Sequence, residues 1–224
     1  MAERPIFILI PARGGSKGII RKNLQTVGGI PLLSRSINAA KMSQVADSIC
    51  VSTDDDEIRS LALSHDVEVI QRPSELALDT STSEEAISHF LRVFNLTSGL
   101  LVMIQATSPF LSGGDINALV DTCEKFDTAL TVTQSHSFLW RAAADGSLFG
   151  VNHESSVRLR RQDLHQQEFI ENGAAYGMDI RGYLTYRHRF FGRIGRVEMP
   201  RIRSLEIDSS QDLELANTIE TTLE

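Results

Sequence analysis

Short apolar runs alternate with amphipathic stretches through the first 133 residues. The run from Ile6 to Ile10 is continuously apolar, which is typical of a strand buried on both faces of a sheet. Similar runs predict further strands at residues 49–53, 67–70, 100–104 and 129–133. Between the runs, apolar residues recur every three or four positions and predict helices that begin near Pro31, Asp54, Ser83 and Asp115. This alternation predicts an α/β fold, a Rossmann-like, mostly parallel sheet with helices on both faces.

The alternation stops after residue 133. Residues 134–175 are polar and show no strong helical period, so we expect an excursion from the core that contains short antiparallel strands. Residues 196–199 predict a returning strand, and the apolar spacing over residues 213–219 predicts a closing helix. The chain is therefore expected to be a single domain over residues 1–224 with a small lobe outside the main sheet.

Composition excludes several classes of protein. The chain has 224 residues, of which 42% are apolar and 23% charged, as in an ordinary soluble globular protein. Its net charge of −7 argues against non-specific binding to nucleic acid, and it lacks the run of about 20 apolar residues that a membrane span needs. Cys50 and Cys123 lie in apolar contexts and are expected to be buried free thiols. With no apparent secretory signal before Ile6, we expect a cytoplasmic protein.

The most informative segment follows the first predicted strand. Residues 11–23 read Pro-Ala-Arg-Gly-Gly-Ser-Lys-Gly-Ile-Ile-Arg-Lys-Asn, with three glycines that let the backbone approach a ligand and form an anion-binding nest. The segment matches neither the Walker A loop nor the Rossmann fingerprint. A solvated turn is the alternative, but four cations at the carboxyl end of a strand favour a polyphosphate site. These cations are Arg13, Lys17, Arg21 and Lys22.

Residues 10–23 resemble the signature of the acylneuraminate cytidylyltransferases, the CMP-sialic acid synthetases. Other similar blocks follow in the family's order, at residues 51–54, 72–83, 105–109, 160–163, 171–174 and 206–213. The resemblance covers nearly the whole chain, and its first block is long and specific. It implies a nucleotidyltransferase that moves CMP from CTP to the anomeric hydroxyl of a sialic-acid-like nonulosonic acid, an α-keto acid sugar, and releases pyrophosphate.

The resemblance also implies a set of site residues. The catalytic residues would be Lys22, Arg13 and Asp208. The nucleotide-binding residues would be Ala12, Arg13, Gly15, Ser16, Lys17, Asn23, Arg72, Ser81 and Ser83. The sugar-binding residues would be Gln105, Arg161, Phe190 and Phe191. The cofactor would be Mg²⁺, bound by Asp208 and Glu206, since this ion favours one or two carboxylates together with phosphate oxygens and waters.

Some of these residues have simpler explanations. Ser83 suits a helix N-cap, Arg72 suits a surface position before a turn, and the Phe190–Phe191 pair suits ordinary packing. The acidic run from Asp54 to Glu57 is best explained as a helix start that complements the helix dipole. The histidines lack metal-binding spacing, so zinc has no support.

Three departures from the family pattern leave alternatives open. Glu206 stands where the family usually has Asp, Ile20 stands where Pro is common, and residues 164–170 lack an Arg that some relatives have. A Kdo-type cytidylyltransferase and a nucleotide-binding module without turnover therefore remain as alternatives. The resemblance further implies a homodimer in which residues 134–185 form the dimerisation excursion.

Overall fold

A seven-stranded sheet forms the core of the molecule. The computed structural model describes residues 4–16, 18–157, 160 and 167–223. The strand order is β11-β7-β10-β6-β1-β4-β5. These strands are β1 (Ile6–Pro11), β4 (Ser48–Thr53), β5 (Glu68–Gln71), β6 (Leu100–Ile104), β7 (Thr128–Ser135), β10 (Glu168–Asp179) and β11 (Ile194–Glu198). All neighbouring pairs are parallel except those of β10, which runs antiparallel to both β6 and β7, so the predicted fold class is confirmed.

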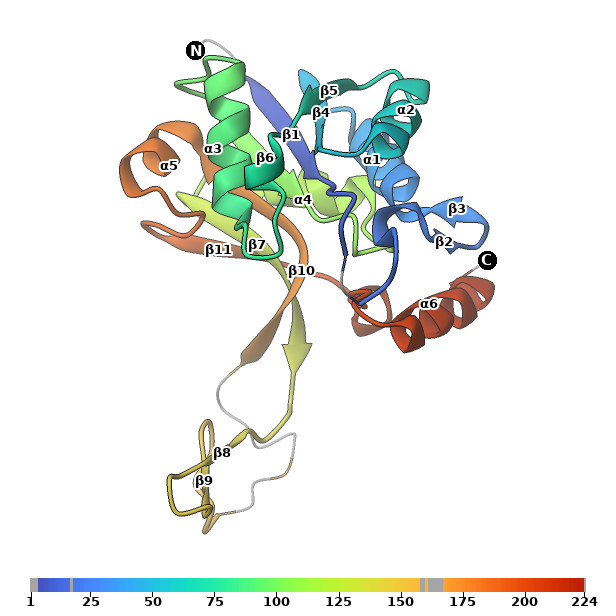
Figure 1. Ribbon diagram of the computed structural model, residues 1–224. Helices are drawn as coiled ribbons and strands as arrows, with labels where there is room; N and C mark the ends of the chain where they lie inside the picture. The colour runs from blue at the N-terminus through green and yellow to red at the C-terminus, as the bar shows by residue number, and fades with distance from the viewer. Residues whose placement is uncertain (1–3, 17, 158–159, 161–166, 224) are drawn as a thin grey trace.

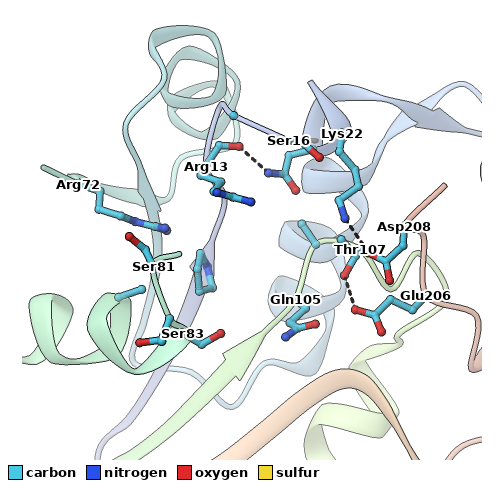
Figure 2. Close-up of a pocket in the computed structure, with 16 residues that line it drawn as sticks. Arg13, Ser16, Lys22, Arg72, Ser81, Ser83, Gln105, Thr107, Glu206 and Asp208 are labelled. Carbon is cyan, nitrogen blue, oxygen red and sulfur yellow. Dashed lines mark hydrogen bonds and ion pairs between the residues drawn. The ribbon is translucent and has the colours of Figure 1, made fainter. Parts of the chain in front are cut away.

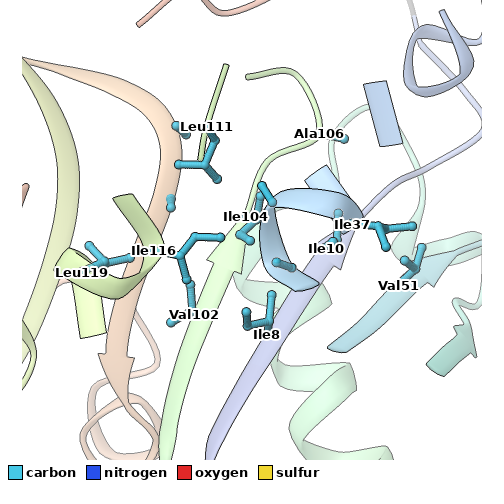
Figure 3. Close-up of a cluster of buried hydrophobic side chains, with 14 of the residues drawn as sticks. Ile8, Ile10, Ile37, Val51, Val102, Ile104, Ala106, Leu111, Ile116 and Leu119 are labelled. Atoms are coloured by element: carbon cyan, nitrogen blue, oxygen red, sulfur yellow. The ribbon is translucent and has the colours of Figure 1, made fainter. Parts of the chain in front are cut away.

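Helices cover both faces of the sheet (Figure 1). They are α1 (Leu32–Ser43), α2 (Asp56–Ser64), α3 (Ser83–Val93), α4 (Gly113–Thr122), α5 (Ile180–Tyr186) and α6 (Ser210–Leu223). Ile8 and Ile10 of β1 belong to a buried cluster with α1, α2 and α4 (Figure 3). Leu9 points to the opposite face and joins a second cluster with α3 and α5. This burial on both faces explains why the β1 segment is apolar without interruption.

The last helix packs at the end of the sheet where the parallel strands finish. It lies beside a short hairpin of β2 (Thr26–Val27) and β3 (Ile30–Pro31), as Figure 1 shows. Ala216 of α6 is buried in a small cluster with Val27 and Ile207. This packing holds the segment before α6 against the carboxyl ends of β1 and β6.

Strand β10 corrects the predicted extent of the excursion. We expected residues 134–185 to lie outside the main sheet, but residues 168–179 form a strand inserted between β7 and β6, and α5 follows it directly. Its centre, Gly173-Ala174-Ala175-Tyr176-Gly177, consists mostly of small residues, so its apolar signal is weak. A Cβ on Gly177 would lie 2.6 Å from Cys123 Sγ, so the close packing of β10 against the end of α4 requires glycine at this position.

The excursion proper is shorter than predicted. It contains the antiparallel pair β8 (Trp140–Ala142) and β9 (Leu148–Gly150), which confirms the expected short strands. Figure 1 shows this pair far from the sheet, at the end of the long extensions of β7 and β10. Trp140 is about half exposed there, although its ring makes an edge contact with His153.

The caps of helices α3 and α4 lie one and three residues before the predicted helix starts at Ser83 and Asp115. Thr82, and not Ser83, caps α3, and Ser112, and not Asp115, caps α4. Both helices begin with a capping box, in which an acidic side chain at the third helical position bonds back to the cap residue. Asp115 therefore lies inside α4, where its carboxylate accepts hydrogen bonds from the cap residue Ser112. Asp55 caps α2, which confirms that the acidic run marks a helix start.

Both cysteines are buried and free, as the sequence predicts. Burial raises the pKa of Cys50 to about 12 and that of Cys123 to about 11, so both remain protonated at neutral pH. Within the described residues, none of the helices combines the length and the apolar character needed to cross a bilayer.

Adjacent glycines at the start of α4 provide a matched test of helix packing. A Cβ on Gly113 would lie 2.8 Å from the backbone of Met42 and Ser43 at the end of α1, whereas a Cβ on Gly114 meets no atom closer than 3.8 Å. We expect Gly113→Ala to lower the free energy of unfolding by about 1–3 kcal/mol through overpacking. We expect Gly114→Ala to change it by less than about 1 kcal/mol, in the stabilising direction. Urea denaturation of both variants measures the difference, and equal effects would contradict it.

Candidate functional site

A cavity of about 240 Å³ opens at the carboxyl ends of β1 and β6. The predicted site residues that line it are Arg13, Gly15, Ser16, Lys22, Asn23, Arg72, Ser81, Ser83, Gln105, Glu206 and Asp208. Figure 2 shows that the labelled residues come from four segments: the loop after β1, the start of α3 with the segment before it, the end of β6, and the segment before α6. A crevice at the carboxyl ends of parallel strands is the usual ligand site of such sheets. The structure therefore gathers most of the predicted residues around one space.

Some predicted residues lie elsewhere. Ala12 is buried behind the cavity and donates its backbone N–H to the Ser52 carbonyl. Phe191 is buried and stacks on Tyr186 with ring centroids 5.3 Å apart, so the packing explanation holds for it. Phe190 packs edge-on against Tyr176 and does not line the cavity either. Lys17 and Arg161 lie outside the described residues.

The glycines of the loop after β1 allow close contacts with two acidic segments. Gly14 N donates to Asp54 Oδ1 at 2.9 Å, and a Cβ on Gly14 would lie 2.7 Å from Asp55. A Cβ on Gly18 would lie 2.3 Å from the Asp208 carbonyl oxygen. Gly15 has open space around it. Two of the three glycines are therefore needed to fit the loop into the protein, and the third lies at the cavity.

Arg21 and Lys22 are neighbours in the chain but have different surroundings. Arg21 adopts a left-handed conformation, with φ 53°, and pairs with Glu57 and Asp55 at the start of α2. Lys22 lines the cavity, where its Nζ lies 2.9 Å from Asp208 Oδ1. The prediction that Arg21 belongs to the anion-binding group is therefore wrong, because its guanidinium pairs with acidic side chains at the start of α2 and does not line the cavity.

Arg13 and Arg72 supply positive charge on the opposite side of the cavity from the acidic pair. The Arg13 guanidinium lies 2.9 Å from Asp79, and its backbone carbonyl accepts from Asn23 Nδ2 at 2.9 Å. Arg72 is buried and donates to the Ser52 side chain and carbonyl at 3.0 and 2.6 Å. Burial lowers the pKa of Arg72 to about 10, which leaves it charged at neutral pH. The explanation of Arg72 as a surface residue is therefore wrong.

Glu206 and Asp208 form the acidic edge of the cavity. Their side chains alternate with that of Ile207, which is fully buried. Burial and the neighbouring Asp208 raise the pKa of Glu206. Within the described residues, no group of three or more His, Cys, Asp or Glu side chains forms a metal site. Two carboxylates suit a divalent cation that takes its remaining ligands from phosphate oxygens and water, so the donor set fits such an ion.

Residues behind this edge hold it in place through contacts that the sequence did not reveal. Ile207 N donates to the Thr107 carbonyl at 2.9 Å, and the Asp212 carboxylate accepts from the backbone N–H groups of Asp208 and Ser209. Arg203, just upstream, pairs with Asp115 at the start of α4 through two of its nitrogens. Asp54 was likewise assigned only to a helix start, although its side chain also binds the loop after β1.

Residues 7–169 match the family described as cytidylyltransferase. The chain belongs to the cytidylyltransferase family. It is 34% identical over 221 residues to the N-acylneuraminate cytidylyltransferase of Escherichia coli O18:K1:H7 (strain RS218 / NMEC), covering 96% of this chain and 52% of that protein. It is 38% identical over 179 residues to N-acylneuraminate cytidylyltransferase A of Danio rerio, covering 78% of this chain and 41% of that protein. The chain thus spans about half the length of the curated relatives it matches.

Solved structures share the fold of this chain. A CMP:2-keto-3-deoxy-manno-octonic acid synthetase complexed with CTP superposes with a TM-score of 0.71 at 12% identity, covering 98% of this chain and 100% of that chain. A 4-diphosphocytidyl-2C-methyl-D-erythritol synthase from Anaerococcus prevotii superposes with a TM-score of 0.70 at 15% identity, covering 97% and 99%. At these identities the likeness concerns the fold alone.

The Arg203–Asp115 pair gives a prediction for stability as a function of pH. Burial opposes the charge on Asp115, but hydrogen bonds from Arg203 and Ser112 outweigh it and lower the pKa of this carboxyl group. A lowered pKa stabilises the fold above the unfolded value of about 4, and this stabilisation is lost as the pH falls through the folded value. We expect Asp115→Asn to cost about 1–3 kcal/mol of unfolding free energy at pH 7, because it removes a charged hydrogen-bond partner.

The difference between Asp115→Asn and the parent should shrink as the pH falls below about 4, because Asp115 of the unfolded parent is protonated there while the folded protein still holds it charged, and it vanishes once the folded carboxyl group is protonated too. Urea unfolding at a series of pH values measures both curves. A difference that stays constant down to pH 2 would show that the charge of Asp115 does not stabilise the fold.

Proposed function

We propose that this cytidylyltransferase transfers CMP from CTP to the anomeric hydroxyl of a sialic-acid-like nonulosonic acid and releases pyrophosphate. The observation that carries the proposal is the arrangement of the cavity, where Arg13 and Lys22 share one space with Glu206 and Asp208. Cations suit a triphosphate, and carboxylates suit a cation bound to it. The similarity to N-acylneuraminate cytidylyltransferases over most of the chain supports this substrate pair.

The loop after β1 would bind the triphosphate. Arg13 and Lys17 grip the β- and γ-phosphates, while backbone N–H groups near Gly15 and Ser16 contribute further donors. Lys22 contacts the α-phosphate, where negative charge redistributes as the bond to pyrophosphate breaks. Because phosphoryl and nucleotidyl transfers depend mainly on positioning and charge stabilisation, these cations account for much of the expected rate enhancement.

The acidic edge would hold Mg²⁺ and accept a proton. Asp208 would hold the ion directly, and Glu206 would be the second carboxylate of this edge. When bound, Mg²⁺ neutralises part of the charge on the phosphates. The Asp208 carboxylate also accepts the proton of the attacking anomeric hydroxyl. In the free protein Lys22 pairs with Asp208, so arrival of the phosphates gives Lys22 a stronger anionic partner.

The cytosine base would bind on the α3 side of the cavity. Cytosine presents one amino donor and two acceptors, and Arg72, Ser81 and Ser83 offer matching groups there. Asn23, from the loop after β1, lines the same cavity, and the backbone of the buried Ala12 would complete the set. Since Thr82 caps α3, the Ser83 hydroxyl is not occupied as the helix cap.

The acceptor sugar would bind beside Gln105. Gln105 lies at the end of β6, on the same cavity as the phosphate loop, which would place the sugar next to the α-phosphate. The sugar carboxylate would pair with Arg161, and Phe190 would border the acyl group from beyond the cavity. The buried Phe191 would contribute by supporting the packing around Phe190.

We also propose that the protein is a homodimer in a reducing cytoplasm. The pair of strands β8 and β9, within residues 134–185, projects away from the sheet and exposes Trp140, which suits an aromatic anchor at an interface. The two buried free thiols are consistent with a reducing compartment.

The decisive assay measures pyrophosphate release with CTP, Mg²⁺ and a panel of nonulosonic acids that includes Kdo. We expect product with at least one nine-carbon acid. Turnover with Kdo alone would instead support a Kdo-type enzyme. CTP binding without product from any acid would mean a nucleotide-binding module and would contradict the proposed transfer.

Adjacent cations in the loop allow a matched mutational test. We expect Lys22→Ala to lower kcat by about 10²–10³-fold, because it removes a charge aimed at the reacting phosphate. Arg21→Gln, which changes a cation directed at Glu57 and away from the cavity, should keep kcat within about threefold of the parent. Steady-state kinetics at saturating CTP gives both values. A Lys22→Ala enzyme within a few-fold of the parent would refute the assigned role.

A further inference from the structure

Glu206 is directed away from the phosphate loop. Asp208, two residues later, pairs with Lys22 of that loop, whereas Glu206 Oε1 accepts a hydrogen bond from Thr107 Oγ1 at 3.3 Å. Figure 2 shows the Glu206 carboxylate beneath Thr107, on the Gln105 side of the cavity. The two carboxylates therefore serve different parts of the cavity, although they are close in the chain.

The Gln105 side chain completes this arrangement. One end of its amide faces two acceptors, the Glu206 carboxylate and the Gly173 carbonyl, so that end must be the nitrogen. With the two ends exchanged relative to Figure 2, Nε2 donates to Glu206 Oε1 at 3.1 Å and to the Gly173 carbonyl at 3.0 Å. Both amide hydrogens are then used, and the amide oxygen occupies the other end of the side chain, away from Glu206. Gln105 itself lines the cavity.

Gly173 provides the space for this contact. It adopts φ 71°, a conformation that favours glycine, and it lies where the pairing of β10 with β7 is interrupted. A Cβ at this position would lie 2.9 Å from Glu206 Oε2 and 3.1 Å from its Cδ. The carboxylate of the longer Glu side chain thus fits against the bare backbone of Gly173.

We propose that Glu206 is a positioning residue that holds the Gln105 amide with its oxygen facing the cavity, so that the site selects an acceptor sugar with a hydroxyl or amide N–H donor at that point. Asp208 is then the direct carboxylate ligand of the metal, and Glu206 is not. This inference rests on the proposed function and specifies how its acceptor is selected. The inference also explains why position 206 has Glu where the family usually has Asp, because the extra methylene brings the carboxylate within hydrogen-bonding distance of the Gln105 amide.

Two substitutions separate the positioning role from a metal-ligand role. Glu206→Gln keeps the length and an acceptor oxygen for Gln105 but removes the charge. Glu206→Asp keeps the charge but shortens the side chain. We expect Glu206→Asp to raise the KM for the acceptor about tenfold, the effect of losing about 1.4 kcal/mol of interaction, with kcat and the KM for CTP within about threefold. Glu206→Gln, which keeps an acceptor oxygen at the same length, should raise the KM for the acceptor at least threefold less than Glu206→Asp does.

A second measurement does not depend on turnover. Mn²⁺ binding to the parent and the variants, followed by electron paramagnetic resonance with a non-hydrolysable CTP analogue, should be within threefold for both Glu206 variants and at least tenfold weaker for Asp208→Asn. Acceptor binding by calorimetry with the same analogue should be about tenfold weaker for Glu206→Asp only. Glu214→Asp, an exposed Glu on α6, is the matched control and should change none of these values.

The outcomes decide between the roles. At least tenfold weaker Mn²⁺ binding by Glu206→Gln, with Glu206→Asp unaffected, would establish Glu206 as a metal ligand and overturn the inference. Equal acceptor affinity in the two variants would overturn it as well. Failure of the parent to bind or convert any nonulosonic acid would instead refute the proposed function, and that result is visible before any variant is compared.

Discussion

The ion pair between Lys22 and Asp208 joins segments 186 residues apart in the sequence and brings the glycine-rich loop against the acidic edge of the cavity. The pair itself contributes little stability, because the Asp208 side chain is 70% exposed. The pair matters for geometry, because it brings Lys22 of the loop after β1 next to the Asp208 carboxylate of the segment before α6. Close approach of Gly18 to the Asp208 backbone reinforces the same contact. The proposed chemistry needs both charges within reach of one phosphate.

Packing behind the acidic edge makes this meeting possible. Ile207 is completely buried, so the side chains on either side of it face the cavity. Helix α6 packs on the hairpin of β2 and β3, where Asn217 accepts from Gly28 N and donates to the Thr26 carbonyl. Arg203 ties the same segment to the start of α4. A short acidic motif is thus fixed by apolar burial on one side and by hydrogen bonds and an ion pair on the other.

The proposed function divides the cavity into a phosphate side and an acceptor side. Arg13 and Lys22 lie on the phosphate side, whereas Gln105 and Glu206 lie where β6 and β10 meet. Strand β10 matters here beyond its place in the core, because the interruption of its pairing places the Gly173 carbonyl beside the Gln105 amide. The irregular pairing of β10 around Gly173 therefore affects both how Glu206 packs against the strand and the proposed selection of the acceptor.

The parallel half of the fold was predictable from the sequence, because strands such as β1 are buried on both faces and therefore read as unbroken apolar runs. The glycines and cations of the loop after β1 also marked this loop as part of the cavity. Strand β10 was not, since its centre consists of small residues with a weak apolar signal. The need for Gly177 is visible only from its close contact with Leu119 and Cys123 at α4. Nor did the sequence distinguish Arg21 from Lys22, which are adjacent and both basic. Residue types and their spacing determined the fold class and the cations available. Only the tertiary structure decided which cation faces the cavity, because that choice depends on the acidic groups that distant segments bring alongside.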